Sequence, residues 1–303
     1  MRFLSRSVHT TRILLVGAGR MGAMHRRVLE SNAGVSLVGV VDPRPPGWPG
    51  ISWESDLDTA LVRLRPQAVV VAVPPGDHAS VARTCLGAGC DVLLEKPICP
   101  QAGEARELAD DFRRAGRVLF GGQSERFHPV FRALRSELER APGWRSIRCV
   151  REGPEPRTIP EGGALLDLAV HDLDLALRLD GSLSLLGSVE TGTGSVRVHL
   201  GGAGRSVEIV VGYQPVRRRT WDVEGEGGTW HADLLARSLY RHPSGGARTS
   251  LWIDRVDALE TEHLRFLEAC RGGEWWSDLQ IQIRAVDLAR EIIDRMDGSP
   301  IQA

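Results

Sequence analysis

The first 122 residues alternate short apolar runs with segments that have helical spacing. The apolar runs are RILLVGAG, VSLVGVVD, QAVVVAV, DVLLEKP and RVLFGG, which begin at Arg12, Val35, Gln67, Asp91 and Arg117. Strands that are apolar along their whole length are buried on both faces, which is typical of a parallel sheet between two layers of helices. The alternation therefore predicts a doubly wound α/β domain.

The pattern changes in the second part of the chain. Residues 127–141 and 161–181 have helical patterns, residues 186–230 are β-rich with glycine-containing turns, and amphipathic helices close the chain. Several strands in succession with tight turns indicate an antiparallel sheet. We therefore expect an α/β domain in residues 1–121 and an α+β domain in residues 122–303.

Composition narrows the class of protein. The chain has 303 residues, 42% of them hydrophobic, and a net charge of -1. The near-neutral balance argues against a dedicated nucleic-acid or membrane-surface protein, and no apolar run approaches the roughly 20 residues of a membrane span. The first residues, MRFLSRSVHTT, are basic and lack the apolar core of a secretory signal, so we expect a short N-terminal lead and a cytoplasmic protein.

The five cysteines give no metal-ligand pattern. Their number is odd, and no CxxC or Cys/His spacing is present. We interpret them as reduced thiols that act as small buried hydrophobic side chains, and we predict no metal site.

The motif GAGRMG follows the first predicted strand and opens the first predicted helix, with Gly17, Gly19 and Gly22 in GxGxxG spacing. Gly17 permits a tight turn, Gly19 lets the backbone approach a pyrophosphate, and Gly22 allows close packing of helix and strand. The helix N-terminus favours an anion, which places Arg20 and Met21 at the same site.

Asp42 ends the second predicted strand, about 20 residues beyond the glycine motif. An acidic residue at this place accepts hydrogen bonds from a ribose 2′-hydroxyl and repels a 2′-phosphate. Together these features predict a Rossmann dinucleotide site that binds NAD, and Arg44, two residues later, leaves NADP open. The alternative is a glycine-rich turn of another α/β fold.

Two further loops follow predicted strands, where ligands bind in such sheets. The first contains Pro74 and His78; we expect Pro74 at the cofactor, and His78 either lies near the cofactor or caps the next helix. The second contains Glu95 and Lys96, followed by Pro97. Either Glu95 and Lys96 face the cofactor crevice, or they form a surface ion pair in a loop.

The segment GGALLDLAVHDLDLALRLDG carries ionisable residues on an otherwise apolar helix, which is the pattern of a buried helix. Asp167, His171 and Asp174 are spaced i, i+4 and i+7 and so share one helical face. Burying a carboxylate is costly unless it is paired, so we expect this face to line a polar cleft. A buried core histidine is the alternative for His171, and Asp172 and Asp174 are expected to be caps or ion-pair partners of Arg178.

The Gly17–Gly22 loop, the triplet Glu95–Lys96–Pro97 and the segment GGALLDLAVHDLD together resemble the Gfo/Idh/MocA oxidoreductases. The resemblance implies a Rossmann domain followed by an α+β domain with a mainly antiparallel open sheet that carries the substrate face. It implies that Lys96, Asp167 and His171 line the substrate site beside the nicotinamide, and that like chains assemble through the sheet of the second domain.

Two segments are similar to a subgroup that acts on UDP-N-acetylglucosamine at C3. They are GGQSERFHPVFRAL, with His128 in place of asparagine and Gln123 in place of histidine, and REGPEPR. The arginines of these segments are expected to hold a diphosphate, because a planar guanidinium pairs well with phosphate: Arg126, Arg151 and Arg157.

These observations predict an NAD(P)-dependent oxidoreductase that transfers hydride between a sugar ring hydroxyl, C3 of a UDP-linked amino sugar, and the nicotinamide. His171 is the expected general base, because imidazole suits proton transfer near neutral pH. Asp167 orients the ring or binds a sugar hydroxyl, and Lys96 stabilises the developing alkoxide. The alternatives are a dehydrogenase of a free sugar or a polyol such as inositol, and an NAD(P)-binding sensor without turnover.

Overall fold

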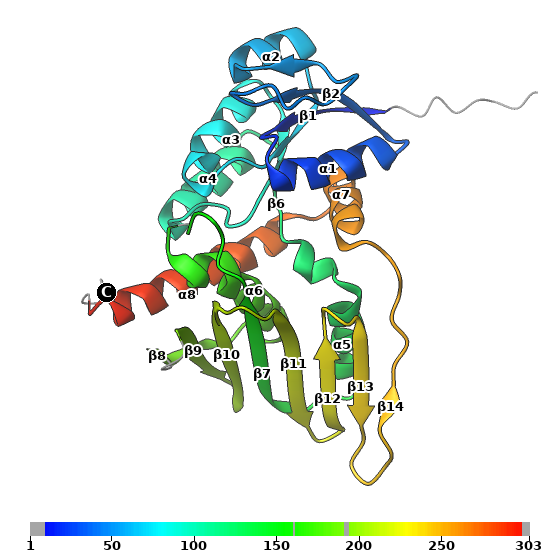
Figure 1. Ribbon diagram of the computed structural model, residues 1–303, viewed down its shortest axis with the longest axis vertical. Helices are drawn as coiled ribbons and strands as arrows, with labels where there is room; N and C mark the ends of the chain where they lie inside the picture. The colour runs from blue at the N-terminus through cyan, green and yellow to red at the C-terminus, as the bar shows by residue number, and fades with distance from the viewer. Residues whose placement is uncertain (1–9, 160, 191–193, 299–303) are drawn as a thin grey trace, which may run out of the picture. The chain divides into compact units, whose positions relative to one another are not determined.

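Figure 1 shows the computed structural model, which describes residues 10–159, 161–190 and 194–298. The predicted N-terminal lead lies almost entirely in residues 1–9, outside the described residues. The chain folds as two compact units that are not continuous in sequence. The first unit comprises residues 1–99, 104–122 and 263–279, and the second comprises residues 100–103, 123–262 and 280–303.

Within the described residues, the first unit contains a six-stranded parallel sheet with the order β3-β2-β1-β4-β5-β6. This is the strand order of a Rossmann fold, whose order reverses between β1 and β4. The strands are β1 (Thr11–Val16), β2 (Val35–Val41), β3 (Trp53–Glu54), β4 (Ala68–Val71), β5 (Asp91–Leu94) and β6 (Leu119–Gly121).

Helices flank this sheet and bury its apolar strands (Figure 1). In β4 every residue is buried, which explains why its sequence, AVVV, shows no alternation. The helix after β3 begins where the Asp56 carboxylate accepts a hydrogen bond from the backbone N–H of Thr59. The helices that follow these strands are α1 (Arg20–Ser31), α2 (Leu57–Leu64), α3 (His78–Gly87) and α4 (Ala102–Arg114).

The second unit contains eight strands among its described residues, in the order β14-β13-β12-β11-β7-β10-β9-β8. Only the pair β7 and β10 is parallel in the part of this sheet that the structure describes. The strands are β7 (Trp144–Gly153), β8 (Ser184–Glu190), β9 (Ser195–Gly202), β10 (Arg205–Tyr213), β11 (Arg218–Gly225), β12 (Gly228–Asp233), β13 (Ser238–His242) and β14 (Thr249–Ser250).

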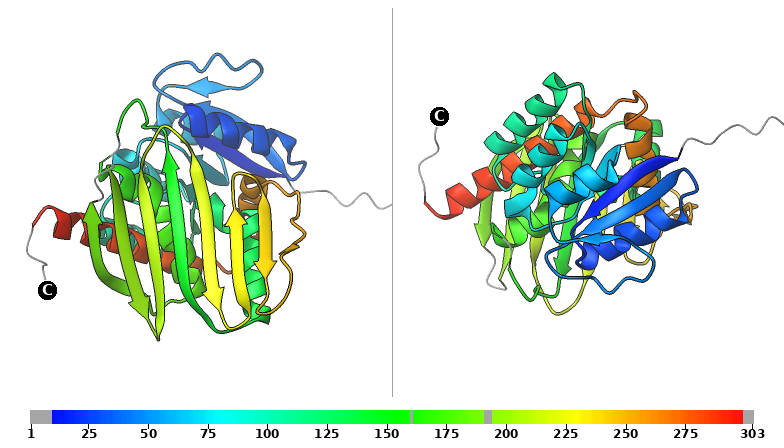
Figure 2. Two further views of the ribbon diagram at one scale, coloured as in Figure 1. Left: turned by 60° about the horizontal axis from the view of Figure 1, so that its bottom comes forward. Right: turned by 90° about the horizontal axis from the view of Figure 1, so that it is seen from above.

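Helices α5 (Pro129–Arg140) and α6 (Val170–Leu179) lie behind one face of this sheet (Figure 2). Helices α7 (Ala258–Ala269) and α8 (Trp276–Met296) each contribute residues to both units. A parallel Rossmann sheet and a mainly antiparallel sheet with helices confirm the predicted fold class, an α/β domain followed by an α+β domain.

The helix predicted for residues 161–181 is not regular. Residues Leu165–Ala169 form a π-helical turn, and the α-helix α6 starts only at Val170. The π-turn includes Asp167, whereas His171 lies in the α-helix. Because a π-turn holds more residues than an α-turn, the i, i+4 stacking expected for these two side chains does not apply unchanged.

No helix among the described residues has the length and apolar character needed to cross a membrane. All five cysteines have free thiols, and four of them are buried, as predicted: Cys85, Cys90, Cys99 and Cys149. Burial raises the pKa of the Cys90 thiol to about 11, which leaves it protonated at neutral pH.

Candidate functional site

The glycine loop joins β1 to α1 at the carboxyl edge of the first sheet. Gly17 has a φ of +96°, and a Cβ there would lie 2.5 Å from the carbonyl oxygen of Ala72. A Cβ on Gly22 would lie 2.0 Å from the carbonyl oxygen of Gly17. A side chain is therefore excluded at both positions by the fold itself, as the sequence predicted.

Gly19 differs from the other two glycines. It is exposed, its φ is −70°, and a Cβ there would meet no heavy atom of the described chain within 4 Å. Neither backbone strain nor internal packing requires glycine at this position, so open space for a ligand is the remaining physical reason. The site thus fits a pyrophosphate at the N-terminus of α1.

The Asp42 carboxylate is fixed beside this loop. Its Oδ2 accepts a hydrogen bond from the backbone N–H of Ala18 at 2.9 Å, and its Oδ1 accepts one from the N–H of Arg44 at 3.0 Å. A carboxylate has about four lone-pair sites, so it can accept ribose hydroxyls as well. Asp42 therefore shapes the glycine loop and keeps acceptor capacity beside it.

Pro74 and His78 follow β4, next to the point where the strand order reverses. Pro74 is exposed, which is compatible with its predicted place at the cofactor. His78 is fully buried, with Nδ1 2.9 Å from the Pro97 carbonyl oxygen and Nε2 3.0 Å from that of Val73. Burial also lowers the pKa of His78. His78 therefore links two loops, and we withdraw the direct cofactor contact predicted for it because its ring is inaccessible.

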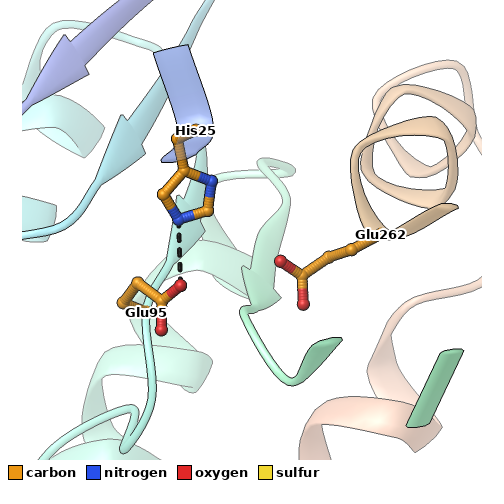
Figure 3. A group of neighbouring side chains, drawn as sticks. All are labelled: His25, Glu95 and Glu262. Atoms are coloured by element: carbon orange, nitrogen blue, oxygen red, sulfur yellow. Dashed lines mark hydrogen bonds and ion pairs between the residues drawn. The ribbon is translucent and has the colours of Figure 1, made fainter. Parts of the chain in front are cut away.

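Glu95 is held inside the first unit by His25 (Figure 3), and His25 in turn contacts His263. His25 Nε2 lies 2.9 Å from Glu95 Oε1, and His25 Nδ1 lies 2.8 Å from Nε2 of His263. The other carboxylate oxygen of Glu95 accepts a hydrogen bond from the Lys96 N–H at 3.0 Å. The predicted cofactor contact of Glu95 and the surface Glu–Lys pair are therefore both replaced by a buried chain that ends at the Lys96 backbone.

Burial alone would raise the pKa of Glu95, but the hydrogen bond and charge of His25 outweigh burial and lower it. Figure 3 also draws Glu262, which belongs to the second unit. Both ring nitrogens of His25 are engaged by partners in the first unit, so we interpret His25 as a hydrogen-bonding residue and assign no metal site here.

Lys96 is partly exposed and lies directly after β5, and its peptide bond to Pro97 is cis. It is also the only lysine of the chain, in which lysine and arginine together number 38. At every other position with a Lys or Arg side chain, the residue is arginine, and only residue 96 is lysine. Lysine can release a proton within a reachable pH range, whereas arginine cannot.

In the second unit, Asp167 and His171 each have a defined partner. The Tyr213 hydroxyl donates a hydrogen bond to Asp167 Oδ2 at 3.3 Å, and burial together with that carboxylate raises the pKa of Tyr213. His171 Nδ1 lies 2.5 Å from Gln123 Oε1. Both Asp167 and His171 are partly exposed, so they are accessible polar groups of an otherwise buried helix.

A buried ionic cluster, which we call the Arg151 cluster, includes Asp172, the residue that follows His171 in the sequence. Arg151 Nε donates to Asp172 Oδ2 at 2.5 Å, and Arg151 Nη1 lies 3.4 Å from Glu125 Oε1. The other two members are Trp221, whose Nε1 donates to Asp172 Oδ1 at 2.9 Å, and Arg219, whose Nη1 donates to Glu125 Oε1 at 2.7 Å.

The Arg151 cluster corrects one prediction. Arg151 is 1% exposed and is neutralised by two carboxylates, so it is not available to a diphosphate. Arg126 is also buried, with its guanidinium 4.6 Å above the ring centre of Phe127, whereas Arg157 is exposed. Asp174 pairs with Arg178 at 2.8 Å, as expected.

Sequence reasoning missed His25, His263 and Tyr213. His25 carried a local signal, since it lies one turn beyond Gly22 on the buried face of α1. Tyr213 carried no such signal, because an aromatic residue at the end of a strand is common in any sheet.

Comparison with known proteins supports the interpretation of the Gly17–Gly22 loop as part of a dinucleotide-binding fold. Residues 11–123 match the Gfo/Idh/MocA sequence model, described as an oxidoreductase family with an NAD-binding Rossmann fold. An inositol 2-dehydrogenase of Rhizobium meliloti is 28% identical over 178 residues, 55% of this chain and 54% of that protein. The dTDP-3,4-didehydro-2,6-dideoxy-alpha-D-glucose 3-reductase of Streptomyces violaceoruber is 30% identical over 225 residues, 67% of this chain and 63% of that protein. The chain thus covers less than two thirds of the length of these relatives.

Solved structures are similar over a greater length. A UDP-N-acetylglucosamine 3-dehydrogenase of Acidithiobacillus ferrooxidans has a TM-score of 0.82 at 22% identity, covering 93% of this chain and 96% of that one. A 3-ketoreductase of Actinomadura kijaniata in complex with TDP-benzene and NADP has a TM-score of 0.82 at 20% identity, covering 93% and 98%. At these identities the similarity shows the fold. What the sequence comparison shows for this chain is the match of residues 11–123 to the Gfo/Idh/MocA oxidoreductase family, described by its NAD-binding Rossmann fold.

Proposed function

We propose that the protein is an NAD(P)-dependent dehydrogenase that oxidises a ring hydroxyl of a sugar. The observation that carries the proposal is the open space at Gly19, next to the fixed Asp42 carboxylate, in a glycine loop of the matched Rossmann family. Gly17, Gly22, Arg20 and Met21 belong to the same loop. NAD is the proposed cofactor because Asp42 repels a 2′-phosphate.

Three side chains are proposed to act on the substrate. The ammonium of Lys96 donates a hydrogen bond to the reacting oxygen and stabilises negative charge as the hydroxyl proton leaves. His171 accepts that proton through Nε2, because its Nδ1 faces Gln123. Asp167, oriented by Tyr213, binds a neighbouring hydroxyl. The bound nicotinamide supplies the hydride acceptor.

For the substrate, we propose a UDP-linked amino sugar oxidised at C3. The support is the similarity of residues 121–134 and 151–157 to the subgroup described above, and a solved relative named for this activity. Arg157 is the exposed arginine of the three considered, so it is the proposed diphosphate contact. The second candidate, a polyol, is favoured by the similarity to an inositol 2-dehydrogenase.

The test is to incubate the protein with NAD or NADP and one of three substrates: UDP-N-acetylglucosamine, N-acetylglucosamine or myo-inositol. Reduced cofactor is followed by absorbance and the loss of two hydrogens by mass spectrometry, with a ketone trap to pull the reaction forward. Turnover of the nucleotide sugar alone is the expected result. Turnover of inositol alone would replace the substrate, and cofactor binding without any turnover would favour a sensor.

Assembly of like chains through the second sheet and a cytoplasmic location remain predictions. Size-exclusion chromatography with light scattering would test the first, and localisation of the tagged protein in its host would test the second.

A further inference from the structure

We propose that Gln123 is a positioning residue that holds His171 in the tautomer with its proton on Nδ1. The lone pair of the ring then lies on Nε2, which is the nitrogen required to accept a proton from the substrate. The inference rests on the proposed function for its catalytic meaning, whereas the tautomer itself is a property of the protein without any ligand.

The inference about the tautomer starts from the contact between Gln123 and His171. Gln123 Oε1 lies 2.5 Å from His171 Nδ1, and an amide oxygen has no proton to give. From this orientation of the amide we infer that the imidazole is the donor and that Nδ1 carries the proton. The hydrogen bond made by one ring nitrogen decides the state of the other, as the carboxylate does in a Ser–His–Asp triad.

The Arg151 cluster fixes the two partners relative to each other. Glu125 lies two residues after Gln123, and Asp172 lies directly after His171. Both carboxylates bind Arg151, which is 1% exposed. The short 3-10 turn Ser124–Phe127 and helix α6 are thus tied together by one buried guanidinium.

The chemistry of the amide also matters. Gln123 is 2% exposed, so water cannot readily replace it as the partner of Nδ1. An amide fixes the ring orientation without adding a charge next to the imidazole. We therefore assign Gln123 the role of orienting the ring through Nδ1, and Asp167 accepts its hydrogen bond from Tyr213.

The experiment is nitrogen NMR of the full chain with 15N-labelled histidine and no ligand, with His171→Asn used to assign the signal. The wild type should show His171 protonated on Nδ1. Gln123→Leu removes the acceptor and should move the population toward the Nε2–H form, whereas Gln123→Glu keeps an acceptor and should retain the Nδ1–H form. Ser124→Ala, on the same turn, is the matched control and should leave the spectrum unchanged.

Activity provides the second readout. Gln123→Leu should lower kcat by roughly tenfold or more, part of the roughly 100-fold or greater contribution of a general base, with the KM for NAD nearly unchanged. A wild-type His171 proton on Nε2 would overturn the inference, because the Gln123 amide would then be the donor. If Gln123→Leu does not fold, the wild-type spectrum still decides. If no sugar is oxidised but the Nδ1–H form is present, the proposed function fails and the positioning role of Gln123 stands.

Discussion

Glu95 is the acidic residue of the Glu95–Lys96–Pro97 triplet, and its carboxylate lies 2.9 Å from the ring of His25, a residue of helix α1 that is 70 positions away in the sequence. The Glu95 carboxylate accepts hydrogen bonds from the His25 ring and from the Lys96 backbone N–H. It thereby helps to fix the backbone at the end of β5. The triplet therefore combines a buried structural carboxylate with a partly exposed lysine side chain.

His25→Leu should destabilise the protein by roughly 3 kcal/mol or more at neutral pH, because it leaves the Glu95 carboxylate buried without its main partner. The loss should shrink as the pH falls from 7 to 4. In the wild type the lowered pKa of Glu95 contributes stability above the unfolded value of about 4.3, and this is lost as the pH falls through the folded pKa. In the variant the unpaired acid takes up a proton instead.

Thermal melts at both pH values would measure this. His231→Leu removes an exposed histidine–Asp222 pair and serves as the control, with little effect expected. An equal loss of stability at pH 7 and pH 4 would show that the His25–Glu95 pair does not depend on charge.

Replacing Asp42 should separate two roles. Asp42→Asn keeps an acceptor for the Ala18 N–H but removes the charge, so it should narrow the preference for NAD over NADP while leaving the loop intact. Asp42→Ala loses both functions and should weaken both cofactors. Calorimetric titration with NAD and NADP would show this, and tighter wild-type binding of NADP would rule out the proposed ribose contact.

Lys96→Ala should lower kcat by about 100-fold or more with little change in NAD affinity, since it removes one group that stabilises developing charge. Lys96→Arg should not restore the rate, because a guanidinium keeps the charge but differs in shape and cannot release its proton. Steady-state kinetics with the true substrate would measure this effect. Full activity of the arginine variant would show that Lys96 contributes only its positive charge.

Arg151 and Arg157 make opposite predictions. Arg151→Met should destabilise the fold by roughly 3–5 kcal/mol, because it leaves the buried Asp172 carboxylate without its cation and leaves Glu125 paired with Arg219 alone. Arg157→Ala should leave the melting temperature unchanged and raise the KM for a nucleotide sugar. If the Arg151 variant were as stable as the wild type and only bound the nucleotide sugar more weakly, Arg151 would be a diphosphate contact after all.

Sequence reasoning predicted the two kinds of sheet because each has its own periodicity. It assigned Arg151 to a diphosphate because a diphosphate needs cationic partners and because REGPEPR is similar to a subgroup of nucleotide-sugar enzymes, whereas the carboxylates that neutralise Arg151 lie 21 and 26 residues away in the chain. The π-turn at Asp167 could not be predicted from the sequence either, because the residues of this segment fit an α-helical pattern equally well. Burial and pairing are long-range properties, so they require the fold.

The difference between Gly19 and Gly22 offers a way to separate folding from function. A methyl group at Gly22 collides with backbone, so selection there reports on whether the chain can fold at all. A methyl group at Gly19 enters empty space, so a Gly19→Ala protein should be expressed and melt like the parent. Any loss of cofactor affinity in such a protein can be attributed to contact between the added methyl group and the ligand. The size of that loss therefore indicates how closely the ligand approaches the backbone at residue 19.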